Sequence, residues 1–450
     1  MNIDNLGISP LAGLCTYEEA QRPGIGVERN VELLRRYNFV MSRLNLVLAA
    51  HLPATPEWEV KGAISLHLWL DAEHATSLRS RISEMREPPL HLDQVPDDRL
   101  EALMEEVIRA GSTLELLVGV YRVVRGDLVQ SLRKHLADTN PLADHPTRRA
   151  LRLILLEEEE TLTWGETAIS ALNRSAADGE TVLAFEKHLR AFLEAAGGLY
   201  GDLHPSGQAL PTARWDGAPY QMDVVPRRDA RFSDPFNRAA RVDDYYTDDS
   251  LPFEERVMAM MCKRLREMDV PEWMGPILFK TRGKPWEYYR DVSRQLWDEA
   301  RHAMMGEVGF IRGQVPFYRY PVDFRTSYAL NLEFSPLEAH TVLWAIEQSQ
   351  MPRKTGKRYE WTIARDGKDN LAVTFQDYDW ADEVLHAQIG RRWLEADYEN
   401  AEAMRNAGSA IQERLVAVME RLAERSAQAP WWPELLDDLR SGSPELEAVR

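Results

Sequence analysis

Apolar residues recur with the period of an amphipathic α-helix through roughly the first 200 residues. In residues 31–52 they form a broad apolar stripe, which predicts a helix with one buried face. The same period predicts further helices over residues 55–87, 97–136, 145–172 and 179–199. Because only short loops separate them, we interpret residues 1–200 as an N-terminal helical bundle.

The middle of the chain lacks this period. Residues 201–249 are rich in Pro, Gly, Asp and Arg, which indicates a linker on the surface. Helical periodicity then returns. It predicts helices over residues 251–268, 285–306, 335–350, 378–397 and about 399–426. We expect them to form a second bundle over residues 250–426, followed by a C-terminal tail over 427–450.

One segment of the second bundle departs from the helical pattern. In residues 357–375, KRYEWTIARDGKDNLAVTF, polar and apolar positions alternate on both sides of an Asp-Gly pair. This combination is typical of a β-hairpin. The predicted fold is therefore all-α, with two helical bundles in tandem and a β-hairpin inserted in the second.

The net charge of −18 disfavours nucleic acid as a partner, because the chain would repel the phosphates. No run of about 18 apolar residues occurs, so no membrane span is predicted. The N-terminal residues lack the basic and apolar regions of a signal peptide. Two cysteines, Cys15 and Cys262, are too few for a disulfide framework. These features indicate a cytoplasmic protein with small-molecule or protein partners.

The pattern Glu-x-x-His occurs twice, on two predicted helices of the second bundle. Glu299 and His302 form the first copy, and Glu383 and His386 form the second. At this spacing both side chains share one helix face and can reach one cation. Carboxylate oxygen and imidazole nitrogen suit iron or manganese, and carboxylates from two more helices would complete a dinuclear site. The alternative for each pair is a solvated, ion-paired helix face.

Two further glutamates precede these motifs at equal intervals. The interval is 45 residues both from Glu254 to Glu299 and from Glu338 to Glu383. Glu254 shares a helix face with an apolar stripe, where a carboxylate is unfavourable unless a cation compensates it. The alternative for both is a helix cap, since each follows a proline by two residues, and Glu338 also completes a capping-box pattern. If Glu338 is only a cap, Glu347 is the substitute ligand.

The repeated order of a glutamate and a Glu-x-x-His pair resembles the ligand pattern of the ferritin-like diiron-carboxylate superfamily. The resemblance covers roughly residues 246–400. It implies a centre of two iron ions, with manganese or a mixed pair as alternatives. It also implies that Glu299 and Glu383 bridge or chelate the ions and that each histidine holds one. The full implied ligand set is Glu254, Glu299, His302, Glu338, Glu383 and His386.

By the same resemblance, we expect a non-haem diiron oxidase or oxygenase that activates dioxygen to oxidise a small organic substrate. Its partners would then be dioxygen, that substrate and an electron donor. The alternatives are an iron-storing protein and a metal-free helical module for interaction or structure. Oxygenation of a modified nucleoside is a further alternative, which the net charge disfavours.

The first half contains a partial echo of the motif. Residues 58–75 align with residues 286–303 at a constant offset of 228, which places Asp71 and His74 opposite Glu299 and His302. We interpret this as the duplication of one bundle, so that the first would be a degenerate ferritin-like bundle. The position 45 residues before Asp71 is a glycine, and the fourth helix has no histidine. We therefore expect Asp71 and His74 to be hydrogen-bonded rather than metal-bound. The first bundle would be structural, packing against the second or mediating a homodimer.

Overall fold

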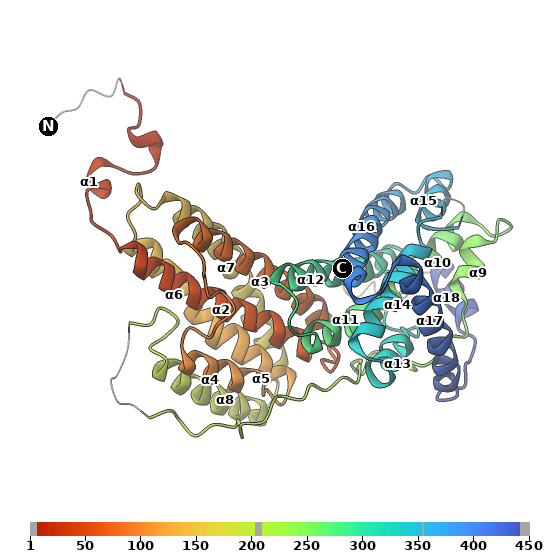
Figure 1. Ribbon diagram of the computed structural model, residues 1–450. Helices are drawn as coiled ribbons and strands as arrows, with labels where there is room; N and C mark the ends of the chain where they lie inside the picture. The colour runs from red at the N-terminus through yellow and green to blue at the C-terminus, as the bar shows by residue number, and fades with distance from the viewer. Residues whose placement is uncertain (1–6, 203–208, 353–354, 442–450) are drawn as a thin grey trace. The chain divides into compact units, whose positions relative to one another are not determined.

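The structure is a computed structural model that describes residues 7–202, 209–352 and 355–441. All regular secondary structure in these ranges is helical (Figure 1), which confirms the predicted all-α class. By its internal contacts the chain divides into two compact units. The first unit comprises Met1–Val47 and Leu70–Gln221, and the second comprises Leu48–Trp69 and Met222–Arg450. Residues 48–69 thus belong to the second unit, although they fall within the predicted N-terminal bundle.

The first unit is built from long helices and one π-helical segment. Its elements are η1 (Leu11–Gly13), α1 (Tyr17–Ala20), most of α2 (Val27–His51) and α3 (Trp58–Met85), α4 (Asp98–Val107), α5 (Thr113–Leu117), the π-helix η2 (Val118–Arg125), α6 (Gly126–Asp138), α7 (His145–Leu172) and α8 (Ala176–Ala195). The π-helix packs against α6, α7 and α8. It therefore lies in the middle of this unit.

The predicted helix over 97–136 is interrupted before α5. The Ser112 hydroxyl accepts a hydrogen bond from the Glu115 backbone N–H at 3.2 Å, and the Glu115 carboxylate accepts one from the Gly111 backbone N–H at 2.7 Å. Serine side chains compete with helical backbone hydrogen bonds in this way, and they favour the start of a new helix. A continuous apolar period therefore hides a break between α4 and α5.

The second unit contains the helices that carry both Glu-x-x-His motifs. After residues 48–69 its elements are α9 (Val242–Thr247), α10 (Phe253–Leu265), η3 (Arg266–Met268), α11 (Asp269–Lys280), α12 (Trp286–Arg312), α13 (Arg325–Glu333), α14 (Pro336–Ser349), α15 (Lys357–Asp366), α16 (Asn370–Leu394), η4 (Glu395–Asp397), α17 (Ala401–Ala423) and α18 (Trp432–Ser441). Helix α12 packs against α10, α11 and α16, while α14 packs against α11, α16 and α17. Helices α12 and α16 are thus direct neighbours, which brings the two motifs together.

A close approach between α10 and α12 is made at one glycine. A Cβ atom added at Gly306 would lie 2.3 Å from the Leu265 backbone nitrogen. Only glycine therefore allows the two backbones to come this near. Around this contact lies an apolar core that includes Met261 and Phe310 of the two helices, together with Trp431 and Trp432 from the C-terminal segment. This packing holds η3, at the end of α10, against α12.

The predicted β-hairpin is wrong for this segment, because residues 357–366 form α15 and residues 370–375 begin α16. The buried residues of α15 are Lys357, Glu360, Ile363 and Ala364, which follow helical rather than alternating spacing. The Asp-Gly pair ends a helix here, since Gly367 is the C-terminal cap of α15. The side chain of Asp369 then caps α16 by accepting a hydrogen bond from the Ala372 backbone N–H at 3.0 Å.

The predicted linker is irregular up to α9, but part of it is bound to the second unit. Asn331 donates a hydrogen bond to the Val224 carbonyl at 2.8 Å, and the Arg227 backbone N–H donates one to the Pro53 carbonyl at 3.0 Å. Asn237 and Tyr246 are buried. Among the helices of the described ranges, none combines the length and the apolar character that crossing a membrane would require.

Candidate metal centre

The two Glu-x-x-His motifs face each other across α12 and α16. Glu299, His302, Glu383 and His386 are all buried, and the two imidazole ring centroids lie 6.0 Å apart. The Nδ1 atom of His386 lies 3.1 Å from Glu299 Oε1, so a histidine of one motif reaches the glutamate of the other. The Nδ1 atom of His302 lies 3.8 Å from Glu299 Oε2. The two motifs therefore form one cluster.

Two aspartates orient the histidines in a crossed arrangement. His302 Nε2 lies 3.1 Å from Asp382 Oδ2, and His386 Nε2 lies 3.4 Å from Asp298 Oδ2. Each aspartate directly precedes the glutamate of the opposite motif. Arg301 holds both aspartates, at 2.7 Å and 2.6 Å. An Nε2–H that donates to a carboxylate leaves the Nδ1 lone pair available to a cation.

Two further glutamates enter the cluster from other elements. Glu347 comes from α14, and Glu267 comes from η3. Ligand atoms within 4.8 Å of one another define three overlapping groups among the described residues of this unit. They are Glu299, Glu347, Glu383 and His386; Glu267, Glu299 and His302; and His302, Asp379 and Glu383. Because Glu299 and Glu383 belong to more than one group, the cluster offers two adjacent cation positions. We call them the His386 position and the His302 position.

The structure does not bring Glu254 and Glu338 into this cluster, which corrects their predicted placement. Glu254 is exposed in the first turn of α10. Glu338 forms a capping box with Ser335, whose backbone N–H donates to its carboxylate at 2.8 Å, and it pairs with Arg414 at 2.8 Å. Glutamates in a first helical turn are stabilised there by the free N–H groups and the helix dipole. The helix-cap alternative therefore describes Glu338, and the substitute, Glu347, lies in the cluster.

Several residues of the cluster were not predicted from the sequence. Asp298 and Asp382 could have been predicted, because both motifs share the pattern Asp-Glu-x-x-His. Glu267 lies within the predicted helix over 251–268, but the equal 45-residue intervals pointed to Glu254 instead. Asp379 lies one turn before Glu383 on the same face of α16. Its proximity to His302 depends on helix packing, which no local pattern reveals.

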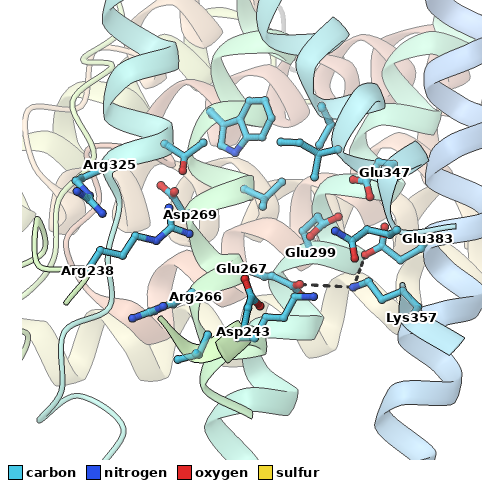
Figure 2. A pocket seen from close by; sticks show the side chains of 18 of the residues that line it. Arg238, Asp243, Arg266, Glu267, Asp269, Glu299, Arg325, Glu347, Lys357 and Glu383 are labelled. Atoms are coloured by element: carbon cyan, nitrogen blue, oxygen red, sulfur yellow. Dashed lines mark ion pairs between the residues drawn. The ribbon is translucent and has the colours of Figure 1, made fainter. Parts of the chain in front are cut away.

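Two buried cations also belong to the cluster, and both lie near the His302 position. Lys357 Nζ lies 2.7 Å from Glu383 Oε1 (Figure 2) and 2.9 Å from Asp379 Oδ1. Arg264 pairs with Glu267 at 2.9 Å and also with Asp379. Buried carboxylates are tolerated when they are paired in this way. Part of the negative charge is therefore already compensated, and this compensation is concentrated away from Glu347.

The pKa values show that the buried carboxylates at the His386 position lie close to one another. Burial raises the pKa of Glu347 well above its usual range, and the charges of Glu383 and Glu299 raise it further. Burial also acts to raise the pKa of Glu383, but Lys357 and hydrogen bonding with Glu347 and His386 hold it well below its usual range. Glu347 therefore keeps a proton when no metal is bound. Burial would lower the pKa of His386, but hydrogen bonds to Asp298 and Glu299 raise it well above its usual range. A metal ion would replace the proton of Glu347 and one proton of His386.

The donor atoms fit a metal ion of the iron or manganese type. Nδ1 of His302 and Nδ1 of His386 are buried and form no hydrogen bond of regular geometry among the described residues, although a carboxylate oxygen lies 3.3 Å from the first and 3.1 Å from the second. Oε2 of Glu383 and Oδ2 of Asp379 are also buried and have no hydrogen bond of regular geometry in these ranges. Unpaired buried polar atoms are rare, and they call for a physical explanation. Imidazole nitrogen and carboxylate oxygen are ligands that these metals accept. The cluster could therefore hold a metal ion.

A cavity of about 490 Å³ reaches the cluster from outside. At one end it is lined by Glu299, Glu347 and Glu383 (Figure 2). Arg238 and Arg325 line the opposite side. The volume lies within the range of small-molecule sites. A ligand in this cavity would lie against the His386 position.

The corresponding cluster in the first unit is filled by an arginine. Arg125, from the π-helix, donates to Asp71 Oδ2 at 2.6 Å and to both carboxylate oxygens of Glu158 at 2.8 Å and 2.9 Å. His74 Nδ1 lies 3.2 Å from Glu158, and Nε2 lies 2.6 Å from Glu157. The expected hydrogen bonding of Asp71 and His74 is thus confirmed. Asp71, His74 and Glu158 could also hold a metal by their spacing, but the guanidinium lies between the two carboxylates.

Comparison of the chain with family models, curated proteins and solved structures finds no match.

Proposed function

We propose that the second unit carries a ferritin-like metal centre and acts as a non-haem iron oxidase or oxygenase. Two iron ions would occupy the two adjacent positions, with manganese or a mixed pair as alternatives. The observation that carries this proposal is the crossed arrangement of the two Asp-Glu-x-x-His motifs. It directs the buried Nδ1 atoms of both His302 and His386 toward carboxylates of the cluster, at 3.3 Å from Glu267 and 3.1 Å from Glu299.

The two positions would differ in affinity. The His386 position has three glutamates and one histidine, and one of these glutamates, Glu347, must hold a proton when no metal is bound. At the His302 position, Lys357 and Arg264 already pair with the carboxylates. An incoming ion must compete with these pairs, so we expect the His386 position to fill first.

The residues around the centre have separate tasks in the proposed reaction. Iron bound here would supply the electrons that reduction of dioxygen requires. Asp298 and Asp382 keep the Nε2 side of each histidine hydrogen-bonded, which fixes the ring orientation. Glu347 releases its proton when the metal binds, and it lines the cavity where that proton can be taken up. The cavity would hold the organic substrate beside the centre.

The proposed centre is tested by metal analysis of the full-length protein purified from iron-supplemented cells. We expect Glu347→Gln to lose most of the iron, because an amide cannot supply the negative charge. Glu338→Gln is the matched control, since it makes the same change on the same helix in a residue that caps α14. Less than a few tenths of an iron atom per chain in the wild type would refute the centre. Equal iron content in the wild type and Glu347→Gln would also refute it.

The oxidase chemistry is tested separately. The anaerobic ferrous protein is mixed with oxygenated buffer, and oxygen consumption and the visible spectrum are followed by stopped flow. We expect oxygen uptake that depends on bound iron and that is lost in Glu347→Gln. A protein that binds iron but consumes no oxygen would contradict the proposed reaction while leaving the metal centre intact.

A metal-free structural module is the second candidate, and one observation favours it. Lys357 and Arg264 are buried and compensate several carboxylates without any metal. In that case the cluster would be an ion-pair network comparable with the one around Arg125. The metal analysis separates the two candidates, because a pure ion-pair network would retain no iron in any variant.

A further inference from the structure

The cavity beside the metal centre has positively charged side chains along its outer part. Arg238, Arg241, Arg266 and Arg325 all line it. Figure 2 shows Arg238, Arg266 and Arg325 on the side opposite Glu299, Glu347 and Glu383. We propose that this cavity binds a small organic anion, whose carboxylate or phosphate group pairs with Arg266 and its neighbouring arginines.

Arg266 is the strongest reason for this proposal. It forms no salt bridge with any carboxylate of the described residues, and its one acceptor there is the Ala240 carbonyl, at 3.3 Å from NH2. Its Nε is buried and has no hydrogen-bond partner in the same ranges. A guanidinium remains charged at all accessible pH values and presents five donors in a planar fork that matches an oxyanion. The side chain therefore has unused donors that a bound anion would satisfy.

The neighbouring arginines are only partly neutralised. Arg238 Nε and Arg325 Nε lie 3.3 Å and 3.2 Å from the two oxygens of a single carboxylate, that of Asp323. Because Arg238 and Arg325 share this one carboxylate, the three side chains together carry a net charge of one positive unit. Arg241 is different, because it is largely exposed and pairs with Asp244 at 3.2 Å. The charge excess thus lies with Arg238, Arg325 and Arg266.

Acidic residues also line the outer part of the cavity, and they do not cancel this excess. Burial and the charges of Asp323 and Glu272 raise the pKa of Asp269 to about 7, so that this carboxyl group is only partly ionised at neutral pH. Asp243 is exposed. Lys263, on the same wall, pairs with Glu360 at 2.5 Å, outside the set of residues that line the cavity. Fixed cations beside paired or exposed acids favour an anion over a neutral ligand.

The apolar part of the lining indicates where the carbon skeleton would lie. Trp273, Leu343 and Ile346 line the cavity together with the charged groups. An anion held by Arg266 would extend its carbon atoms along these side chains toward Glu299 and Glu347. Only the placement of the carbon chain beside the metal centre rests on the proposed function. Binding of the anion by the arginines does not require iron.

The test is a binding measurement on the full-length protein with a matched pair of probes, hexanoate and hexanamide. The two molecules share one carbon skeleton and differ in charge. Isothermal titration is carried out on both the chelator-treated and the iron-loaded protein. We expect hexanoate to bind and hexanamide to bind at least tenfold more weakly. Competition by inorganic phosphate would assign a phosphate-bearing ligand, and its failure to compete would assign a carboxylate.

Arg266→Gln should weaken hexanoate binding at least tenfold, while Arg266→Lys should restore part of it. Arg365→Gln is the control, because Arg365 is exposed on α15 and pairs with Asp366 outside the cavity. Iron content is measured for every variant and should equal that of the wild type. Equal binding of hexanoate and hexanamide, binding of neither, or unchanged affinity in Arg266→Gln would overturn the inference. Absence of bound iron in the wild-type protein would instead count against the proposed function.

Discussion

Removing the guanidinium of Arg125 should destabilise the first unit strongly. The Arg125 side chain is 1% exposed, and the Asp71 and Glu158 side chains that it pairs with are 0% and 1% exposed. Arg125→Met keeps an unbranched apolar side chain but leaves two buried carboxylates with only His74 nearby. Breaking a buried ion pair by removing one partner costs about 3–5 kcal/mol, because the remaining charge stays out of water.

This magnitude can be converted into a melting temperature. The first unit has about 200 residues, and for domains of this size each kcal/mol lowers the transition by roughly 2–4 °C. The expected shift for Arg125→Met is therefore on the order of 6–20 °C. Arg122→Met is the matched control on the same π-helix. Its side chain is 25% exposed and pairs with Glu166, which is 42% exposed, so its loss should cost less than about 1 kcal/mol.

The measurement is differential scanning calorimetry of the full-length protein at neutral pH. Hydrogen exchange of α7, which carries Glu158, identifies the transition that belongs to the first unit. The proposed role of Arg125 is refuted if Arg125→Met shifts that transition by no more than Arg122→Met does. It is also refuted if the transition of the second unit moves by the same amount, because the effect would then not be local to the Arg125 cluster.

Three further predictions concern the two clusters. Asp71→Asn with His74→Gln should leave iron content and oxygen uptake near wild type, and loss of half the iron would make both units metal domains. Lys357→Met should let a second iron ion bind more tightly in a metal titration, since it removes a cation that pairs with Glu383 and Asp379; an unchanged titration would exclude this competition. Burial alone would lower the pKa of His74, but hydrogen bonds to Glu157 and Glu158 raise it to about 9 from 6.5. The stabilisation from protonated His74 is therefore complete below about pH 6.5 and lost as the pH rises through about 9. Urea unfolding of the first unit should show this fall, which His74→Gln should flatten.

Helix positions were largely predictable because the apolar period reports one buried face. The predicted helix over 145–172 coincides with α7, and the one over 335–350 agrees with α14 to within one residue at each end. The hairpin prediction failed because Asp-Gly is compatible with both a tight turn and a helix C-terminus. What decides between them is burial: Lys357 and Glu360 are buried one turn apart. That arrangement depends on the acidic and basic partners which other helices supply.

The site was predictable only where one helix carries two ligands. Glu299 with His302, and Glu383 with His386, are fixed by local spacing, so their pairing needs no tertiary knowledge. Single ligands are different, because a lone glutamate in a helix has no internal partner to identify it. Glu254 and Glu338 satisfied the interval and the proline context, yet Glu267 and Glu347 occupy the cluster. Both of the latter lie deeper in their predicted helices than the first-turn glutamates do.

The two clusters differ in how completely the buried arginine and lysine side chains compensate the carboxylate and imidazole groups around them. In the first unit both nitrogens of His74 have carboxylate partners, and Arg125 spans Asp71 and Glu158. In the second unit Lys357 and Arg264 pair with carboxylates, while Nδ1 of His302 and Nδ1 of His386 lie 3.3 Å and 3.1 Å from carboxylate oxygens without a hydrogen bond of regular geometry. A guanidinium donates hydrogen bonds but does not act as a Lewis acid toward an imidazole lone pair. It can therefore replace a metal only where the negative charge of carboxylate oxygens has to be neutralised. Two imidazole nitrogens directed at carboxylates that both motifs share therefore favour the second unit as the one that binds metal.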